Sequence, residues 1–386
     1  MFGTRAVRSG LPHDATGVLV EPICLATTFA QQGVGSPMGP YVYSRPSNPN
    51  REGYEKAVAD LESANHALAF SSGRAATAAV IQGLSSKSHI VSMASMYSGN
   101  HRYLTQVALA FDVEVSFVED IHTGLAPLLD KLGENVKLVW IETPSNPTLS
   151  LVDIQTVAKL AHQWGVLLVV DNTFLSPYIQ NPLKHGADIV LHSATNNLSG
   201  HSDVLMGTVA FNSPEILETL SFIQNTAGSV PSRFDCWLAH RGLKTLHLRA
   251  SAASHNALIL AKALQASHHI ISVDYPGLAE HAQRMLAICQ HRNGLGGGMI
   301  SFRIRGGLKA AERFCASARL FTLAESLGGL ESLCEIPAIM TYKGMPEDVR
   351  GGAGIYDDLV RLSVGIEDAD DLLQDLLAAL ENAALI

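Results

Sequence analysis

The sequence predicts an α/β protein in which a mainly parallel sheet forms a large domain and a smaller α+β domain follows it. After residue 64, short runs rich in β-branched residues alternate with helical stretches, the order expected of a parallel sheet. These runs are continuously apolar, which is typical of strands that helices bury on both faces. From about Gly242 the pattern changes to a long helix and then a mixture of strands and helices, which indicates a separate unit.

Each element has its own signal in the sequence. Apolar positions at helical spacing predict helices over 50–64 and 154–165, and Gly165 is expected to close the second one. Strands of the large sheet are expected at 88–93, 113–119, 137–143, 165–172, 188–194 and 205–211. In the C-terminal part we expect a helix within 243–267, a strand at 296–307, a helix at 308–321, and a strand at 358–368 that leads into a final helix.

The first fifty residues show little periodicity and are rich in Gly, Pro, Thr and Ser, so they are expected to form an extended arm. The predicted organisation is therefore an N-terminal arm at 1–50 that contacts a neighbouring subunit, a large domain at 51–245 and a small domain at 246–386.

Composition and charge exclude several classes of protein. With 47% hydrophobic and 16% charged residues, the chain can bury a large core, and its net charge of -9 argues against nucleic acid or an anionic membrane as a partner. It has no apolar run of about 18 residues, as a membrane span needs, and no apolar signal-peptide segment. The five cysteines are scattered without a Cys-x-x-Cys pair, and the histidines lack metal-ligand spacing. We therefore expect a cytoplasmic protein without a metal site.

Polar residues follow three of the predicted strands directly. In an open parallel sheet the carboxyl ends of the strands meet at one edge, where ligands bind. The residues at these ends are Glu142 and Thr143, Asp171 and Asn172, and Ser193 and Thr195. The turn "ETPSNPT" after the first strand offers the Asn146 amide to a ligand. Since Asp, Ser and Pro are also ordinary turn residues, plain turns remain the alternative.

Two further segments carry side chains suited to an anionic ligand. The run "AFSSGRAAT" places Ser72, Gly73 and Arg74 at the start of a helix, where free N–H groups bind phosphate, although Ser72 also suits an ordinary N-cap. In the arm, Tyr43 and Arg45 either hold an anion, dock on a second subunit, or belong to a solvated loop.

Taken together, these segments resemble the pyridoxal-phosphate-dependent enzymes of cysteine and methionine metabolism, the family of cystathionine γ-lyase and cystathionine γ-synthase. The resemblance runs in family order through "EPICLATTF", "YSRPSNPNR", "FSSGRAAT", "VWIETPSNPT", "VVDNTFLSPY", "HSAT", "GHSDVLMG", "RGLKTLHLR", "TLAESLGGLESLCEIPAIMT" and "RLSVGIED". It covers nearly the whole chain and is strongest toward the fungal-type cystathionine γ-lyases. It implies the fold of aspartate aminotransferase (fold type I), pyridoxal 5′-phosphate as the cofactor, and a homotetramer of dimers that share active sites.

The resemblance also implies roles for individual residues. Asp171 would pair with the pyridine nitrogen of the cofactor, Tyr97 would stack on the ring, and Asn146 would hydrogen-bond the ring hydroxyl. The phosphate would be surrounded by Ser72, Gly73, Arg74, Ser193 and Thr195, joined by Tyr43 and Arg45 from a neighbouring subunit. On the substrate side, Arg361 would bind the carboxylate, and Glu325, with Ser326 beside it, would face the distal end.

One position departs from this pattern at the centre of the predicted chemistry. The family's Schiff-base lysine directly follows the Ser-x-Thr pair, and here that position is Asn196. A neutral amide neither forms an imine nor exchanges a proton near neutral pH. Three interpretations stay open: an inactivated variant of an active enzyme, a natural relative that binds the cofactor without turnover, and a modified lysine written as asparagine. The intact remainder of the site favours an active parent.

The resulting hypothesis is γ-elimination or γ-replacement on a homoserine-derived amino acid, with cleavage of cystathionine to cysteine, 2-oxobutanoate and ammonia as the first choice. A γ-replacement synthase that uses O-acetylhomoserine is the second choice, and a non-catalytic cofactor-binding protein is the third. Pro46, Ser98, Asn100 and Asn197 also differ from the usual family residues, which leaves the exact substrate open.

Overall fold

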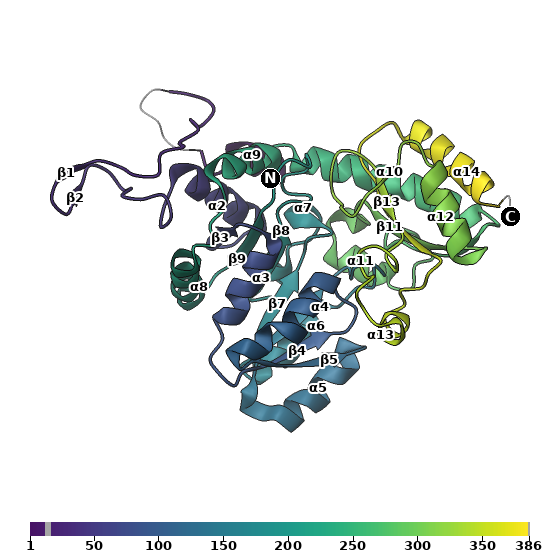
Figure 1. Ribbon diagram of the computed structural model, residues 1–386, viewed down its shortest axis with the longest axis horizontal. Coiled ribbons are helices and arrows are strands. Elements are labelled where there is room, and N and C mark those ends of the chain that lie inside the picture. Colours follow the sequence, from purple (N-terminus) through teal and green to yellow (C-terminus); the bar gives the residue numbers. More distant parts are fainter. Residues whose placement is uncertain (12–16, 385–386) are drawn as a thin grey trace.

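Two sheets organise the computed structural model of the chain, which describes residues 1–11 and 17–384 (Figure 1). The larger sheet has the strand order β3-β9-β8-β7-β6-β4-β5. Its strands are β3 (His66–Phe70), β4 (His89–Met93), β5 (Glu114–Val118), β6 (Val136–Glu142), β7 (Leu167–Asp171), β8 (Ile189–Ser193) and β9 (Gly207–Phe211). Strands β4 to β8 pair in parallel, whereas β9 is antiparallel to both β8 and β3. The predicted mainly parallel sheet is confirmed.

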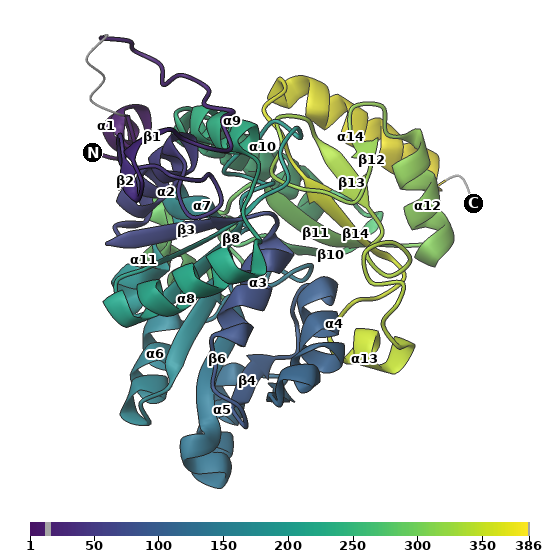
Figure 2. The ribbon, with the colours of Figure 1, turned by 60° about the vertical axis from the view of Figure 1, so that its left-hand side comes forward.

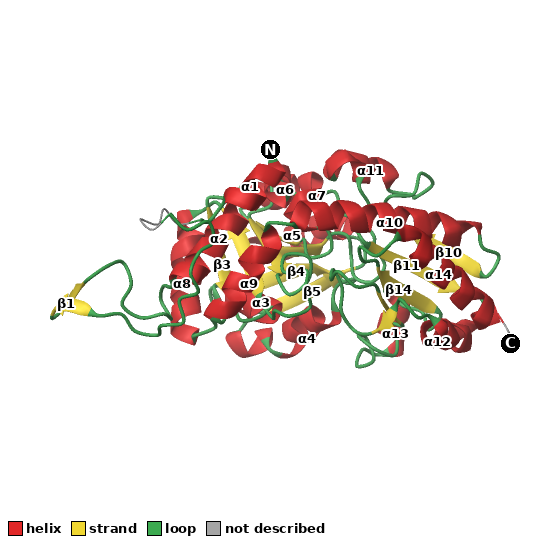
Figure 3. Ribbon diagram, turned by 90° about the horizontal axis from the view of Figure 1, so that it is seen from above, coloured by secondary structure: helices red, strands yellow, loops and turns green. Residues whose placement is uncertain are grey.

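Helices cover both faces of this sheet, so that the strands lie between two helical layers when the molecule is seen from above (Figure 3). They are α2 (Pro49–Glu62), α3 (Gly73–Gln82), α4 (Ser98–Gln106), α5 (Ile121–Leu132), α6 (Ile154–Gln163), α7 (Ser176–Ile179), α8 (Pro214–Ala227) and α9 (Arg233–Leu243). Side-chain caps start several of them: the Asp153 carboxylate accepts from Thr156 N at α6. The same helix ends as expected, with Gly165 in the left-handed region just after it.

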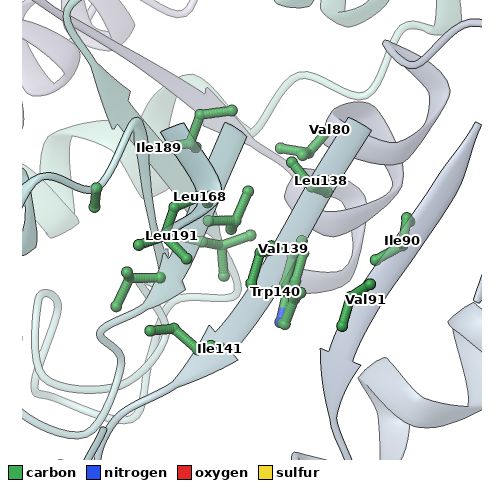
Figure 4. Packing of buried hydrophobic residues seen from close by; sticks show 14 of the residues in the cluster. Val80, Ile90, Val91, Leu138, Val139, Trp140, Ile141, Leu168, Ile189 and Leu191 are labelled. Atoms are coloured by element: carbon green, nitrogen blue, oxygen red, sulfur yellow. The ribbon is translucent and has the colours of Figure 1, made fainter. Parts of the chain in front are cut away.

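The core of the large sheet centres on β6, where Leu138, Val139, Trp140 and Ile141 are completely buried (Figure 4). Every residue of β4 and β9 is buried as well. This is the reason for the continuous apolar runs in the sequence, because a strand covered on both faces has no solvent side for polar residues. The sheet therefore gives a rigid base for the polar side chains at its carboxyl ends.

The second sheet lies beside the first and has the order β10-β11-β14-β13-β12 (Figure 2). Its strands are β10 (Ile270–Asp274), β11 (Met299–Ile304), β12 (Thr322–Leu323), β13 (Leu333–Glu335) and β14 (Leu359–Ser363). The helices of this part are α10 (Leu246–Ala266), α11 (Arg284–Gln290), α12 (Gly307–Ser317), α13 (Glu347–Gly352) and α14 (Ala369–Ala384). A core of its own joins α10, α12 and α14 to β11 and β14, as expected of a separate unit.

The N-terminal segment differs in part from the extended arm that the sequence predicts. Residues 2–8 form helix α1 (Phe2–Arg8), whose Phe2 and Ala6 bury against Tyr54 and its neighbours in the same chain. Farther along, β1 (Gln31–Gly33) and β2 (Ser36–Pro37) pair as a small hairpin that projects away from the body (Figure 3). Part of the predicted arm, residues 12–16, lies outside the described residues.

No helix within residues 1–11 and 17–384 is long and apolar enough to cross a membrane. Short 3₁₀ helices complete the described elements at Ala108–Phe111, Gly133–Asn135, Pro182–His185 and Arg292–Gly294.

Candidate active site

A cavity of about 300 Å³ opens where the carboxyl ends of β6, β7 and β8 meet the second sheet. Most residues that the sequence singles out line it: Tyr97, Asn146, Asp171, Ser193, Thr195, Asn196, Glu325, Ser326 and Arg361. Glu142, at the end of β6, lines it too. The polar strand ends therefore converge on one cavity, which excludes plain turns as their full explanation.

Two neighbouring carboxyl groups form the base of the cavity. Asp171 and Glu142 end β7 and β6 and face each other in register. The Asp171 carboxylate accepts hydrogen bonds from the backbone N and the Oγ1 of Thr173, at 3.0 and 2.5 Å. Glu142 is buried and accepts from the Asn100 amide at 2.7 Å and from Tyr97 N at 2.9 Å. Burial raises the pKa of both groups, and the Asp171 charge further raises that of Glu142.

This pair fits a cationic heteroaromatic ring. Because two adjacent carboxyls, one buried and one half-buried, do not both ionise readily, a positive group at Asp171 relieves their repulsion. Asp171 has the stronger hydrogen-bond support from Thr173, so it is the member that we expect to carry the charge. A protonated pyridine nitrogen is such a cation, and the exposed ring of Tyr97 lies at the same cavity.

The pH dependence of stability tests the raised pKa of Glu142. In the folded chain this group holds a proton that the unfolded chain releases near its ordinary pKa of 4.5. The stability that it contributes is fully present below that pKa and is lost as the pH rises through the raised folded value. We expect the Tm of the ligand-free chain to fall between about pH 5 and pH 8, and to fall less in Glu142→Gln.

Differential scanning calorimetry at several pH values provides this comparison. Glu55 is also buried, with a pKa raised to about 7, and adds to the slope of both proteins. Only the difference between the two slopes therefore reports on Glu142. The exposed Glu312→Gln in α12 is the matched control, and equal slopes in all three proteins would contradict the argument.

The part of the cavity wall that Ser193 and Thr195 form suits an anion. Helix α3 begins beside β8, and a Cβ on Gly73 would lie 3.1 Å from the Cβ of Ser193, so the glycine permits this close approach. Ser193 and Thr195 line the cavity, whereas Ser72 and Gly73 do not, so the start of α3 lies beside the cavity wall at Ser193. Ser72 does act as the N-cap, because its Oγ accepts from Ala75 N at 3.0 Å. The N-cap explains why a serine stands at position 72, and its contact with a phosphate stays a prediction.

The Arg74 side chain does not line the cavity. Its guanidinium lies over the ring of Tyr97, 5.3 Å from the centroid, and donates to Asn100 Oδ1 at 2.5 Å. Asn100 thus links Arg74 to Glu142, and Gly99 leaves the space that the guanidinium fills. The role of Arg74 at the phosphate therefore stays a prediction, and in this structure its guanidinium contacts Tyr97 and Asn100.

The second sheet contributes the basic group of the cavity. Arg361 lies on β14 and is only 3% exposed. Its Nη1 donates to Asn146 Oδ1 at 2.9 Å and pairs with Glu335 at 3.0 Å, while Nη2 donates to the Ser326 carbonyl at 3.2 Å. Glu325 lines the same part of the cavity. A carboxylate that enters here meets a buried arginine held by three neighbours.

Tyr43 and Arg45 are not brought to this cavity. Tyr43 is 46% exposed and bridges to Thr28 in the arm, while Arg45 donates to Asn225 Oδ1 at 3.2 Å. The Arg45 guanidinium also lies over the Tyr43 ring at 5.8 Å. The two residues are therefore together on the arm, away from the cavity of their own chain.

Asn196 lies in the cavity wall directly after Thr195. Its Oδ1 accepts from the Ser193 hydroxyl at 3.3 Å, and its backbone N donates to Ser193 O. The next residue, Asn197, turns away and donates to the Thr173 carbonyl at 2.8 Å. No lysine occurs among the described residues that line the cavity.

Sequence reasoning missed four residues that shape this site. Thr173 fixes Asp171, Asn100 fixes Glu142, and Glu335 with Thr341 fixes Arg361. Thr173 had a detectable signal, because a hydroxyl two residues after a strand-end Asp is typical of a local hydrogen-bonded turn. The others depend on contacts between distant segments and carry no local signal.

The cavity combines a strand-end carboxylate with an arginine from a second sheet, and a helix start suited to phosphate lies beside its wall at Ser193. In agreement with it, the chain belongs to the Cys/Met metabolism PLP-dependent enzyme family, whose model matches residues 3–381. Pyridoxal 5′-phosphate is the cofactor of that family, as the sequence predicts. The fold class is confirmed as well, because solved members superpose over nearly the full chain.

Individual relatives are named for reactions of cystathionine. The chain is 55% identical to cystathionine γ-lyase of Saccharomyces cerevisiae, over 99% of this chain and 98% of that protein. It is 46% identical to cystathionine γ-lyase of Dictyostelium discoideum, over the same shares. The crystal structure of the yeast γ-lyase superposes with a TM-score of 0.96 at 54% identity, covering 99% and 98% of the two chains. A cystathionine γ-synthase from Xanthomonas oryzae pv. oryzae in complex with cystathionine reaches a TM-score of 0.94 at 40% identity, over 99% and 98%.

Proposed function

We propose that this chain carries the framework of a γ-elimination or γ-replacement enzyme for a homoserine-derived amino acid, with cystathionine as the preferred substrate class. Asn196 makes it a form that binds cofactor and amino acid and turns over slowly. The observation that carries the proposal is the position of Asn196 in the cavity wall that also holds Asp171 and Arg361. The names of the relatives support the choice of cystathionine.

Each residue of the cavity has its own role in the proposed reaction. Bound pyridoxal 5′-phosphate supplies an electron sink for the negative charge that develops at the Cα of the amino acid. Asp171 keeps the pyridine nitrogen protonated, and Tyr97 covers one ring face. Arg361 holds the α-carboxylate, which orients the rest of the amino acid toward Glu325. Phe174 and Leu205, which also line the cavity, add apolar surface to its wall.

The missing function is proton transfer and covalent exchange at residue 196. Removal of the Cα and Cβ protons needs a base beside these carbons, and an amide has no basic lone pair near neutral pH. The Ser193 hydroxyl holds Asn196 Oδ1, but neither side chain replaces an amine. Binding and orientation are therefore expected to survive in a chain whose turnover is slow.

Borohydride reduction followed by peptide mass spectrometry tests the state of residue 196. Borohydride fixes a lysine-linked cofactor irreversibly, so a lysine at this position would gain the reduced cofactor mass. For the chain as it stands we expect cofactor to bind and no modified peptide at residue 196. Finding a cofactor adduct there would show that the residue is a lysine derivative and would remove the basis for slow turnover.

Two other functions use the same cavity. A γ-replacement synthase would take O-acetylhomoserine, and the γ-synthase relatives favour it as the second candidate. A cofactor-binding protein without a reaction is the third candidate, and Asn196 itself is the observation that supports it. Assays of the Asn196→Lys protein on cystathionine and on O-acetylhomoserine, with and without a thiol nucleophile, separate all three.

We further propose a cytoplasmic homotetramer built from dimers that share active sites. The projecting arm exposes Leu19, Leu25 and Met38, and it carries Tyr43 and Arg45 away from their own cavity. A neighbouring cavity is where such an arm gains contacts and where its cation meets a phosphate. The free cysteines support a reducing compartment. A cofactor-loaded monomer in sedimentation velocity would contradict the shared site.

A further inference from the structure

Glu335 is a buried carboxylate beside the cavity that no step of the proposed reaction uses. It ends β13 directly opposite Arg361 in the antiparallel pairing of β13 with β14. Its side chain is 1% exposed and lies 3.0 Å from Arg361 Nη1. The other carboxylate oxygen accepts a hydrogen bond from Thr341 Oγ1 at 2.6 Å. Glu335 is thus held on both sides before any ligand enters.

The contacts of the Arg361 guanidinium are uneven. Nη1 faces both Glu335 and the Asn146 side chain, at 3.0 and 2.9 Å. On the other edge, Nη2 has only the long 3.2 Å bond to Ser326 O, and the buried Nε has no partner among the described residues. This edge, made of Nε and Nη2, is the one that Arg303 uses to bind Asp358 side-on. An unpartnered buried donor at a cavity points to an anionic ligand.

The orientation of the Arg361 guanidinium decides whether its Nε–Nη2 edge can bind a carboxylate. A guanidinium on four rotatable bonds has several rotamers, and a carboxylate bound through two parallel hydrogen bonds accepts only one of them. Fixing Nη1 leaves the Nε–Nη2 edge as the free one. The charge of Arg361 also needs a partner in the absence of ligand, because an isolated buried cation is costly. Burial raises the pKa of Glu335, and the Arg361 charge opposes that rise.

We propose that Glu335 is a positioning residue for the substrate carboxylate: it holds Arg361 by Nη1 so that the Nε–Nη2 edge faces the cavity, ready for a carboxylate. The inference rests on the proposed function, in which Arg361 binds the α-carboxylate of an amino acid. It predicts that a change at Glu335 alters the affinity for the carboxylate and leaves the affinity for the amine group unchanged.

Two ligands that differ only by the carboxylate group separate these contributions. L-2-Aminobutyrate carries an amine and a carboxylate, whereas propylamine lacks only the carboxylate. Each is titrated into the cofactor-loaded protein, and the absorbance of the bound cofactor gives its Kd. In Glu335→Leu we expect the Kd of 2-aminobutyrate to rise roughly 10- to 100-fold, the size of a lost charge-assisted hydrogen bond, with the Kd of propylamine unchanged.

Glu335→Gln serves as the conservative rescue. Its amide oxygen can take the place of the Glu335 oxygen that lies 3.0 Å from Arg361 Nη1, and its amide N–H faces Thr341, so the arginine keeps its orientation. The variant also lacks the negative charge that repels the ligand carboxylate, so it should bind 2-aminobutyrate at least as tightly as the parent. A general structural defect would weaken both ligands in both variants. Asp358→Asn, which removes another ion pair of the same sheet, is the matched control and should leave the ratio of the two Kd values unchanged.

The outcomes are distinguishable. Glu335→Leu with an unchanged ratio of the two Kd values, or Glu335→Gln weakened as much as Glu335→Leu, overturns the positioning role. A parent that itself binds propylamine as tightly as 2-aminobutyrate overturns the role of Arg361 in the proposed function instead. If Glu335→Leu does not fold, Thr341→Val removes the second support of Glu335 and should give a smaller shift in the same direction, for 2-aminobutyrate alone.

Discussion

Asn196→Lys is expected to raise the rate of 2-oxobutanoate release from cystathionine by at least roughly 10²- to 10⁴-fold, the contribution of a positioned proton-transfer group. A lysine at residue 196 would also supply the covalent attachment of the cofactor that an amide cannot, so the full gain should exceed this range. The remainder of the cavity is already in place, because Asp171, Tyr97 and Arg361 line it together. Steady-state assay of 2-oxobutanoate measures the change.

Asn197→Lys is the control for this experiment. It adds the same charge one residue farther along, where the side chain turns toward the Thr173 carbonyl, away from the cavity. It should gain neither turnover nor a borohydride-fixed cofactor. If Asn196→Lys forms the covalent link and still processes neither cystathionine nor O-acetylhomoserine, the proposed enzyme framework is wrong and the non-catalytic candidate gains support.

Asp171→Asn is expected to weaken binding of pyridoxal 5′-phosphate roughly 10- to 100-fold. In the proposed site the carboxylate would accept a charge-assisted hydrogen bond from the protonated pyridine nitrogen, and such a bond contributes about 1.5–3 kcal/mol. The amide keeps the size of the side chain, and its oxygen can still accept the hydrogen bonds from Thr173. The change therefore removes the negative charge without disturbing the fold. Without covalent attachment at residue 196, the loss appears directly in the Kd from equilibrium dialysis.

The control for this change is Asp188→Asn, which removes a carboxylate of the same sheet that faces His162 and Leu168 N far from the cavity wall. Its cofactor affinity should equal that of the parent. Equal affinity of Asp171→Asn and the parent would mean that the ring nitrogen is bound elsewhere. The stability of both variants is measured in parallel, because Asp171 lies beside the buried Glu142.

Most of the fold can be predicted from the sequence because its strands are buried on both faces. The apolar runs at 137–143 and 188–194 correspond to β6 and β8, and the helical spacing at 154–165 corresponds to α6. Helix α1 escaped prediction because seven residues give too short a periodic signal, and its stability comes from burying Phe2 and Ala6 against distant elements.

The candidate site was predictable where function falls on local motifs. Asp171, Ser193 and Thr195 follow strands directly, and the topology of a parallel sheet brings such ends together. Glu335 could not be found in this way, because its importance arises from the register of β13 against β14. For Arg74 the motif predicts a phosphate contact, which stays a prediction, whereas the contacts of its guanidinium with Tyr97 and Asn100 arise from tertiary packing that carries no local signal.

The hydrogen bond between Asn146 and Arg361 joins the turn after β6 to the second sheet. An amino acid that spans from the cofactor ring to Arg361 would add a second contact between the two sheets. Ligand binding should therefore couple the stability of one sheet to that of the other. Ligand should therefore merge their thermal transitions into one cooperative event. Mutations that destabilise the C-terminal sheet should therefore lower the affinity for the amino acid first. The affinity for the cofactor should change less, because its proposed contacts lie on the larger sheet.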